Sequence, residues 1–563
     1  MKKWQLQSKT VVNDKDQLLK VLLKNRQIKA KEVKNFFHPK RPEHWQLADL
    51  GFNLSHFNQI QKRLRIAQEN EEKVYIFGDY DSDGICASAV LWEGLKFLGI
   101  NSLPFIPNRQ KHGYGLSIKA LKDLFSDKGK PDLLITVDNG IVALPALKYL
   151  VKEGVEVIVT DHHQQGQEKL PVLAIFHSTQ VCGTAVAWFL VKELFKSVDK
   201  QEQARKKLDD LLSLVAIATV TDLMELLGIN RSLVSHGLLA LHKSERPGLL
   251  ALYHLAGIKK EDLSSYHLGY VIGPRINAMG RLADSMDALR LLCTKNTKQA
   301  KELAKLLQDT NLERQDLTKD LIDQAEATLT KEEREAKIII IEGDYHEGVI
   351  GLLAGRLAEK YLKPCIVLSV AKDLKDKELA IKASARSLAG FNITDFLRQV
   401  EEQLLSVGGH PLAAGFSLKA KNLSSVKKRL LILANKQLDQ VSLEAEIKVD
   451  CPISSSLLNI DTALALEDFE PHGNANPRPI FLLNNLILQN LQNLGKDGQH
   501  AKMFFKSQKE EKEIVVLAWN FFENHEQFEL GKNFDILLKL AVNRWRNTSK
   551  LQATLQAIKK TTL

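Results

Sequence analysis

Cysteine is scarce in this sequence of 563 residues, and no two cysteines stand close together. A zinc knuckle or a disulfide framework needs cysteines at short, regular spacings, and no Cys-x-x-Cys pair occurs here. Scattered cysteines are typical of proteins from a reducing compartment. We therefore expect a cytoplasmic protein without a thiolate-held metal. The five are Cys86, Cys182, Cys293, Cys365 and Cys451.

Long apolar runs are also missing. No run reaches the ~18 residues of a membrane-spanning helix. Residues 1–7 lack the apolar core of a signal peptide. The sequence accordingly predicts no membrane partner.

The sequence has no excess of acidic residues either. Lys and Arg number 78 against 68 Asp and Glu, a formal net charge of +10. Residues 531–563 contain seven Lys or Arg and one acid, a local charge of +6. This balance favours an anionic partner, above all nucleic acid, although a lysine-rich surface would give similar totals. At ~150 residues per domain, the length suggests three or four domains.

Three aspartates at alternate positions follow a short apolar run. Residues 74–77 have the pattern of a buried strand, and Asp79, Asp81 and Asp83 come directly after it. Helical spacing of apolar residues begins at Ile85, so the acids lie in a turn from strand to helix. Open α/β sheets place their sites at this end of a strand. Three like charges this close repel one another unless a cation holds them, so the stretch predicts a metal site.

Other aspartate-rich loops fit this pattern less well. An EF-hand needs a Glu at its twelfth position, which here is Val90, and a helix rather than a strand before the loop. Haloacid-dehalogenase phosphatases need Thr or Val at the position of Asp83. A solvated acidic turn would leave three acids at the end of a buried strand without partners, which is costly.

Two further apolar runs also end in ionisable residues. Residues 133–137 lead into Asp138, and residues 155–160 lead into Asp161, His162 and His163. A helical spacing lies between the two runs, so this region predicts a parallel α/β sheet. Because parallel strands end at the same edge, we expect the three loops to meet there and to form a metal site. A lone histidine would more often be a core or surface residue.

Further polar residues follow in segments that could serve the same site. Asp222 ends an apolar helix over 211–220, where an acid is either a helix cap or a ligand. Residues 106–116 form a glycine-containing loop with Arg109, which suits either phosphate contact or a plain basic surface. Residues 273–282 read as a polar turn with Arg275 and Arg281 and could bind phosphate.

A second α/β body is expected beyond residue 336. From Thr297 to about Lys337 there is neither Gly nor Pro, so we expect one long helix that joins two bodies. A strand at 337–341 opens the second body. Polar turns are expected at 383–387, with Ser384 and Arg386, and at 407–411, with His410.

The last ~120 residues predict a small β barrel, because strand-like runs alternate with polar turns. Arg544, Trp545 and Arg546 suit base stacking beside phosphate contact. We expect Trp519 to lie in the barrel core.

These motifs in this order closely resemble the bacterial single-stranded-DNA-specific 5′-to-3′ exonucleases of the DHH phosphoesterase superfamily. The resemblance spans about residues 74–480 and is carried by 78–84, 137–140, 161–163, 222, 273–277, 280–282, 346–351, 384–387 and 408–410. It implies an α/β fold in which a parallel-sheet DHH domain is joined by a long helix to a DHH-associated α/β domain, followed by an OB-fold barrel. The expected divisions are a lead-in at 1–52, then 53–295, 296–336, 337–440 and 441–563.

The resemblance also implies roles for single residues and two bound ions, Mn²⁺ or Mg²⁺. Its catalytic residues are Asp83, Asp138, which would bridge the ions, and His163, which would face the scissile phosphate. The implied metal ligands are Asp79, Asp81, Asp83, Asp138, His162 and Asp222. The implied DNA contacts are Arg109, Arg275 or Arg281, Ser384, Arg386 and His410, to which the tail adds Arg544, Trp545 and Arg546. The chain departs from the family at Thr184, where a glycine is usual, and in a short segment after His163.

The implied activity is exonucleolytic hydrolysis of single-stranded DNA in repair and recombination, with a single-stranded-DNA-binding protein and a helicase as candidate partners. A DHH phosphodiesterase for cyclic dinucleotides or short oligonucleotides is the enzyme alternative, but such proteins normally lack a basic barrel tail. A degenerate DHH protein that only binds DNA is the other alternative. It would have lost metal ligands, whereas all six positions are filled here.

Overall fold

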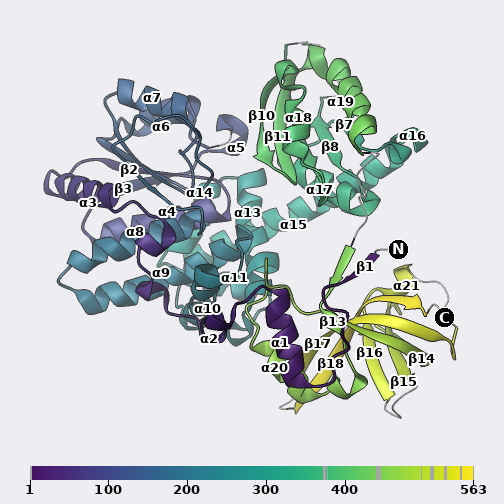
Figure 1. The fold of residues 1–563 in the computed structure, drawn as a ribbon. Helices are drawn as coiled ribbons and strands as arrows, with labels where there is room; N and C mark the ends of the chain where they lie inside the picture. Colours follow the sequence, from purple (N-terminus) through teal and green to yellow (C-terminus); the bar gives the residue numbers. More distant parts are fainter. Residues whose placement is uncertain are drawn as a thin grey trace.

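The computed structural model describes residues 3–113, 115–371, 376, 378–438, 446–495, 497–507, 513–524, 529–545 and 548–561. Two α/β bodies and a β barrel are visible in Figure 1, with helices α13 and α15 between the two bodies. The expected fold class is confirmed. No helix of the described residues is both long and apolar enough to cross a bilayer.

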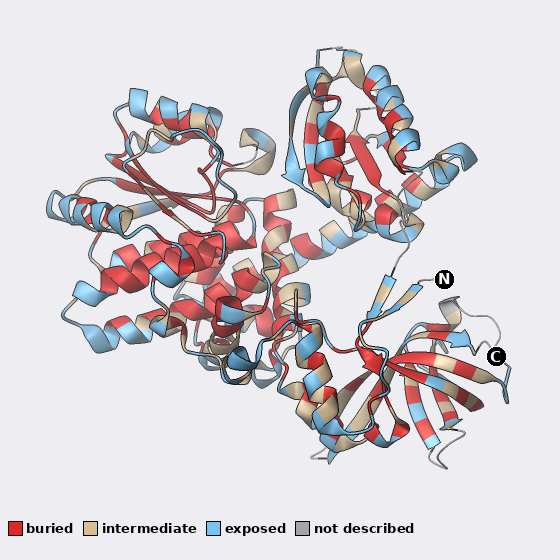
Figure 2. Ribbon diagram, in the orientation of Figure 1, coloured by how far each residue is buried: buried red, intermediate tan, exposed pale blue. Residues whose placement is uncertain are grey.

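The first sheet is parallel throughout, with strand order β3-β2-β4-β5-β6. One face packs its apolar side chains against α6 and α7, and the other packs against α3, α4 and α8. Figure 2 shows this interior as an almost continuous buried region. The elements are α3 (Leu54–Glu69), β2 (Val74–Gly78), α4 (Ser82–Phe97), β3 (Ser102–Phe105), α5 (Arg109–His112), α6 (Ile118–Lys128), β4 (Leu133–Val137), α7 (Leu144–Lys152), β5 (Glu156–Asp161), β6 (Ala174–His177) and α8 (Gly183–Leu194).

A group of helices continues this body. They are α9 (Gln201–Thr221), α10 (Gly228–Lys243), α11 (Pro247–Leu255), α12 (Ser265–His267), the π-helical η6 (Leu268–Ile272), α13 (Gly273–Leu282) and α14 (Ser285–Cys293). The polar turn predicted at 273–282 is wrong, because this stretch is helix α13. Its glycines serve close packing instead: a Cβ on Gly273 would lie 2.2 Å from Cγ2 of Thr221, and one on Gly280 would lie 2.3 Å from the carbonyl oxygen of Tyr80.

The connecting segment is two helices rather than the single one predicted. Helix α15 (Thr297–Thr328) ends before the extended Leu329, and α16 (Lys331–Glu335) begins anew. Thr330 caps α16 through the N–H of Glu333, whose side chain caps Thr330 in return. This capping box starts a new helix and so breaks the expected one.

The second body contains a mixed sheet of order β10-β11-β9-β8-β7. Its elements are β7 (Ile339–Gly343), α17 (Ile350–Tyr361), β8 (Cys365–Ser369), β9 (Ala380–Arg386), α18 (Ile393–Arg398), β10 (Leu404–His410), β11 (Ala413–Lys419) and α19 (Leu423–Leu438). Ser384, Arg386 and His410 were expected in turns but lie in strands. The turn after His410 is shorter than predicted, because β10 and β11 pair as a hairpin up to His410 and Ala413.

The carboxyl-terminal part is a barrel that closes where β14 pairs with β17. Its elements are β12 (Glu446–Val449), β13 (Cys451–Pro452), α20 (Ile460–Glu467), β14 (Phe481–Leu494), β15 (His500–Ser507), β16 (Glu513–Ala518), α21 (Phe521–Asn524), β17 (Asn533–Trp545) and β18 (Thr548–Lys560). The expectation for Trp519 is wrong. Its side chain is 56% exposed, in the turn after β16, and packs edge-on against His500, because phenylalanines such as Phe481 and Phe505 fill the interior.

The amino-terminal segment packs on this barrel, which lies at the other end of the chain. β1 (Lys3–Leu6) pairs in parallel with β12, and α1 (Lys15–Asn25) and α2 (Val33–Phe37) supply apolar side chains to the barrel core. Figure 1 shows α1 beside the barrel strands. Arg231 of α10 fastens this assembly to the first body, since its guanidinium donates to carbonyl oxygens of Phe36 and of residues 468–471.

Candidate metal centre

The aspartate loop between β2 and α4 holds its acids in place through backbone N–H groups. Asp81 caps α4 by accepting from the N–H of Asp83 at 2.9 Å and of Gly84 at 3.1 Å. Asp79 is buried and accepts from the N–H of Tyr80 at 2.7 Å. A Cβ on Gly84 would lie 2.6 Å from the backbone nitrogen of Asp79, so only glycine permits this turn.

Asp83 is bound by the start of α8, which no sequence signal had assigned to the site. Its carboxylate accepts from the N–H of Gly183 at 2.7 Å, from the N–H of Thr184 at 2.8 Å and from the Thr184 hydroxyl at 2.6 Å. A helix start favours negative charge, because its first N–H groups lack partners. Thr184, the departure from the family pattern, thus adds a hydrogen bond to a predicted ligand.

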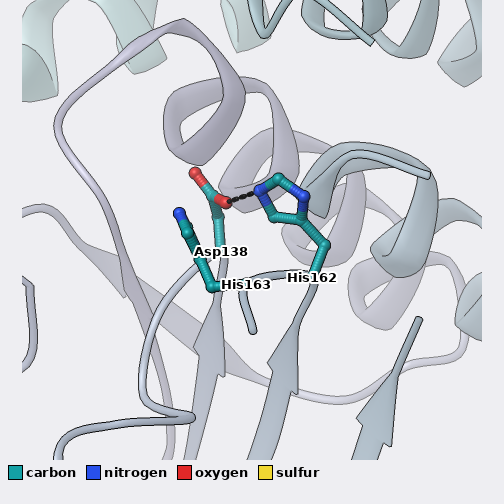
Figure 3. A group of neighbouring side chains, drawn as sticks. All are labelled: Asp138, His162 and His163. Carbon is teal, nitrogen blue, oxygen red and sulfur yellow. Dashed lines mark ion pairs between the residues drawn. The ribbon is translucent and has the colours of Figure 1, made fainter. Parts of the chain in front are cut away.

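Asp138 follows β4 with a φ of +60° and lies beside His162, as Figure 3 shows. Nε2 of His162 is 3.1 Å from Oδ1 of Asp138, 3.7 Å from Oδ2 of Asp83 and 3.8 Å from Oδ2 of Asp222. Asp222 sits at the carboxyl end of α9. Carboxylates from two strand ends and one helix end therefore converge on an imidazole from a third strand end.

Asp161 orients His163, a function that reading the sequence had not given it. Its Oδ1 lies 2.8 Å from Nδ1 of His163, while its Oδ2 accepts from the N–H of Ile141 at 2.9 Å. The hydrogen bond to Asp161 raises the pKa of His163 to about 9. Because Nδ1 is engaged, Nε2 of His163 is the nitrogen left for a substrate.

The donor set fits divalent metal ions. Burial raises the pKa of Asp79 to about 8, helped by Asp81, and raises that of Asp222 to about 9, helped by Asp83. Burial also raises the pKa of Asp138, whose Oδ1 is buried without a hydrogen bond within the described part of the chain. Burial lowers the pKa of His162, which favours the neutral, ligating imidazole.

Among the described residues there are two groups of three potential ligand residues whose ligand atoms all lie within 4.8 Å of one another. One consists of Asp83, His162 and Asp222, and the other of Asp138, His162 and His163. Asp79 and Asp81 fall outside both groups, and the assignment of all six residues as ligands stays a prediction. Carboxylates with an imidazole suit Mn²⁺ or Mg²⁺ better than a thiolate-seeking metal.

Basic side chains gather where the two bodies meet. The guanidinium of Arg109 lies over the Tyr80 ring at 5.2 Å, and Arg281 donates to the carbonyl oxygen of Gly348 at 3.1 Å. Arg386 donates to the Ser384 hydroxyl at 3.1 Å. Burial lowers the pKa of Arg281 to about 10, and the charges of Arg109, Arg314 and Arg386 add to the effect. Arg314 of α15 was not among the predicted residues, because nothing in the spacing of that helix distinguishes it.

The structure places the other predicted DNA contacts elsewhere. Arg275 ties α13 to α15 by donating to Gln308 at 2.7 Å, so of the two arginines only Arg281 belongs to the basic group. His410 is exposed in β10. Arg544 is exposed and pairs with Glu467 at 2.6 Å. Arg546 and the side chain of Trp545 lie outside the described residues.

Fold and site together define a DHH phosphoesterase. Models of three families match the chain: the DHH family N-terminal domain at residues 73–219, the DHHA1 domain at 335–436 and the RecJ OB domain at 449–557. The chain belongs to the RecJ family. It is 30% identical to the single-stranded-DNA-specific exonuclease RecJ of Salmonella typhimurium over 514 residues, which are 86% of this chain and 87% of that protein.

Other relatives are similar over most of this chain. RecJ of Bacillus subtilis is 30% identical over 534 residues, 93% of this chain but 65% of that longer protein. The crystal structure of Thermus thermophilus RecJ in complex with Mn²⁺ has a TM-score of 0.78 at 27% identity and covers 100% of this chain and 80% of that one. RecJ of that organism has also been solved with Mg²⁺.

Proposed function

We propose that this chain is a metal-dependent exonuclease that removes nucleotides from single-stranded DNA in the 5′-to-3′ direction, in repair and recombination. The observation that carries the proposal is the convergence of Asp83, Asp138 and Asp222 on His162. Membership of the RecJ family supports the substrate class. The five unpaired cysteines agree with action in the cytoplasm.

The predicted ligands would hold two ions, with Asp138 between them. When bound, such ions activate a water molecule and neutralise charge on the phosphate. The protein's own part is to fix the ligands before substrate arrives. Thr184 and the start of α8 hold Asp83, and Asp161 holds His163 so that its Nε2 can donate to a phosphate oxygen.

The basic group between the bodies supports the proposed polarity. Arg386, Ser384, Arg281 and Arg109 would bind the phosphate of a 5′ end, because guanidinium groups and a hydroxyl suit phosphate oxygens. A Cβ on Gly351 would lie 2.9 Å from Nη2 of Arg386. Glycine there keeps space beside the guanidinium.

The barrel distinguishes this function from hydrolysis of cyclic dinucleotides. A closed barrel with a basic tail is of no evident use for a substrate of two nucleotides, whereas it suits a long strand. A single-stranded-DNA-binding protein and a helicase are the candidate protein partners, since the first coats single strands and the second produces them from duplex DNA.

A digestion series tests the proposal. We expect the purified protein with Mn²⁺ to shorten single strands labelled at the 3′ end progressively, to release mononucleotides from the 5′ label, and to leave duplexes and cyclic dinucleotides intact. Asp138→Asn should abolish cleavage while its circular dichroism spectrum stays unchanged. Preferred hydrolysis of cyclic dinucleotides, or shortening from the 3′ end, would contradict the proposal.

A further inference from the structure

Two tyrosines are exposed on the helix that leads to the metal centre. Tyr266 in α12 is 62% exposed and Tyr270 in η6 is 75% exposed. Their ring centroids are 5.1 Å apart and their planes differ by 25°, so the rings are stacked on each other. Large aromatic side chains this open to water contribute little to the core, which makes a binding role the better account of them.

The tyrosines share a helix face with residues of the site. α12, η6 and α13 follow one another without a break over 265–282. Tyr266, Tyr270, Asn277 and Arg281 recur at intervals of four, seven and four residues, which places them on one side of the helix. At the far end of this face, Asn277 accepts from the N–H of Ser82 in the aspartate loop at 2.7 Å, and Arg281 belongs to the basic group.

The pair also lies between the metal centre and the barrel. η6 packs on the end of α9, since a Cβ on Gly269 would lie 3.3 Å from Cγ1 of Val220, two residues before the predicted ligand Asp222. On the other side, the hydroxyl of Ser265 donates to the carbonyl oxygen of His472 at 2.6 Å. Residue 472 belongs to the segment that leads into β14.

We propose that Tyr266 and Tyr270 form a stacking platform for the bases of a single-stranded nucleic acid whose 5′ end lies at the metal centre. The inference rests on the proposed function and adds a specific binding surface to it. Stacking on tyrosine tolerates every base, as a sequence-independent nuclease requires. At ~1.5 Å per residue the pair lies ~16–22 Å along the helix from Arg281. If the bases stay stacked at the rise of a duplex strand, about 3.4 Å per nucleotide, this distance corresponds to about the fifth to seventh nucleotide from the 5′ end.

Strand length provides the test. Steady-state cleavage in Mn²⁺ would be measured on strands of four and of twenty nucleotides for Tyr266→Ala, Tyr270→Ala and Tyr270→Trp, with the conservative Tyr266→Phe and Tyr270→Phe as controls that keep a stacking ring. We expect each platform alanine to raise KM for the 20-mer about tenfold, while kcat and all constants for the 4-mer stay unchanged. Tyr270→Trp should restore the KM, because the indole also stacks. An equal loss on both lengths, or no change on the 20-mer, would overturn the platform.

A binding measurement separates this inference from the proposed function. Fluorescence anisotropy with a labelled 20-mer in EDTA needs no cleavage. Abasic sites at nucleotides five to seven should weaken binding by the wild-type protein and have no further effect on the double variant Tyr266→Ala/Tyr270→Ala. If binding follows this pattern but the wild-type protein cleaves no strand, the nuclease proposal is refuted and the stacking platform is still supported. Additive losses from the abasic sites and the double variant would refute the platform even if the wild type cleaves.

Discussion

Asp79→Asn tests whether the carboxylate cluster destabilises the metal-free protein. The folded protein raises the pKa of Asp79 from 3.8 to about 8. Between these values the folded state holds a proton that the unfolded state has lost, so stability falls as the pH rises through this window. Over the three units from pH 5 to 8, the loss reaches about 4 kcal/mol at ~1.36 kcal/mol per unit. Asparagine has the same shape and no charge, which removes this loss.

The assay is thermal unfolding of chelator-treated protein at pH 5 and pH 8. From pH 5 to pH 8 the free energy of unfolding should fall by about 2–4 kcal/mol more in the wild type than in Asp79→Asn. This corresponds to a Tm difference of roughly 4–16 °C for a domain of about 150–250 residues. Because Asp138 and Asp222 also have raised pKa values, the variant should keep part of the pH dependence. Added Mn²⁺ should stabilise wild type at pH 8 more than the variant. The exposed Asp309→Asn is the control.

The reasoning fails if wild type and Asp79→Asn lose equal stability between pH 5 and 8 without metal. It also fails if the variant is the less stable of the two at pH 8, since the carboxylate would then be stabilised by its surroundings rather than penalised.

Three further substitutions have defined outcomes. Arg386→Ala should reduce the preference for 5′-phosphorylated over unphosphorylated strands, measured as a ratio of kcat/KM, with little change in kcat on saturating substrate. An unchanged ratio would show that Arg386 does not bind the 5′ phosphate. Gly183→Ala should weaken the Mn²⁺ dependence of cleavage, because a Cβ would lie 2.7 Å from Oδ1 of Asp138; an unchanged Mn²⁺ titration contradicts this. Arg246→Ala should cost about 3–5 kcal/mol in urea unfolding, because it leaves the buried Glu93 without its bidentate partner; a loss under 1 kcal/mol would contradict it.

The sequence was most informative where local pattern and sheet geometry agree. Apolar runs of four to six residues that end in acids predicted both the parallel sheet and the meeting of Asp83, Asp138 and His162. This works because parallel strands carry their loops to one edge whatever the rest of the chain does. The contacts of Thr184 and Asp161 could not be inferred in this way, since each depends on the rotamer of a side chain brought close by tertiary packing.

The errors have a common physical origin. Glycines in 273–282 suggested a turn, but they are required where two helices and a loop approach closely, which only tertiary structure reveals. The exposed Trp519 contradicted a preference for buried tryptophan, because phenylalanines already fill the barrel. Arg386 was expected in a turn because its segment is polar and short. It lies in a strand because β9 is paired on both sides, with β8 and with β11, and this pairing is set by distant parts of the chain.

The pairing of β1 with β12 imposes an order on folding during synthesis. The strands are separated by about 440 residues, which a ribosome needs roughly 20–90 s to add at ~5–20 residues per second. During that time the apolar side chains of Val12, Leu18 and Phe36 have no core to enter, because that core belongs to the last part of the chain to be made. The amino-terminal segment is therefore synthesised long before the strands on which it packs and can complete its folding only after them, so a chaperone could bind its apolar side chains in the nascent chain.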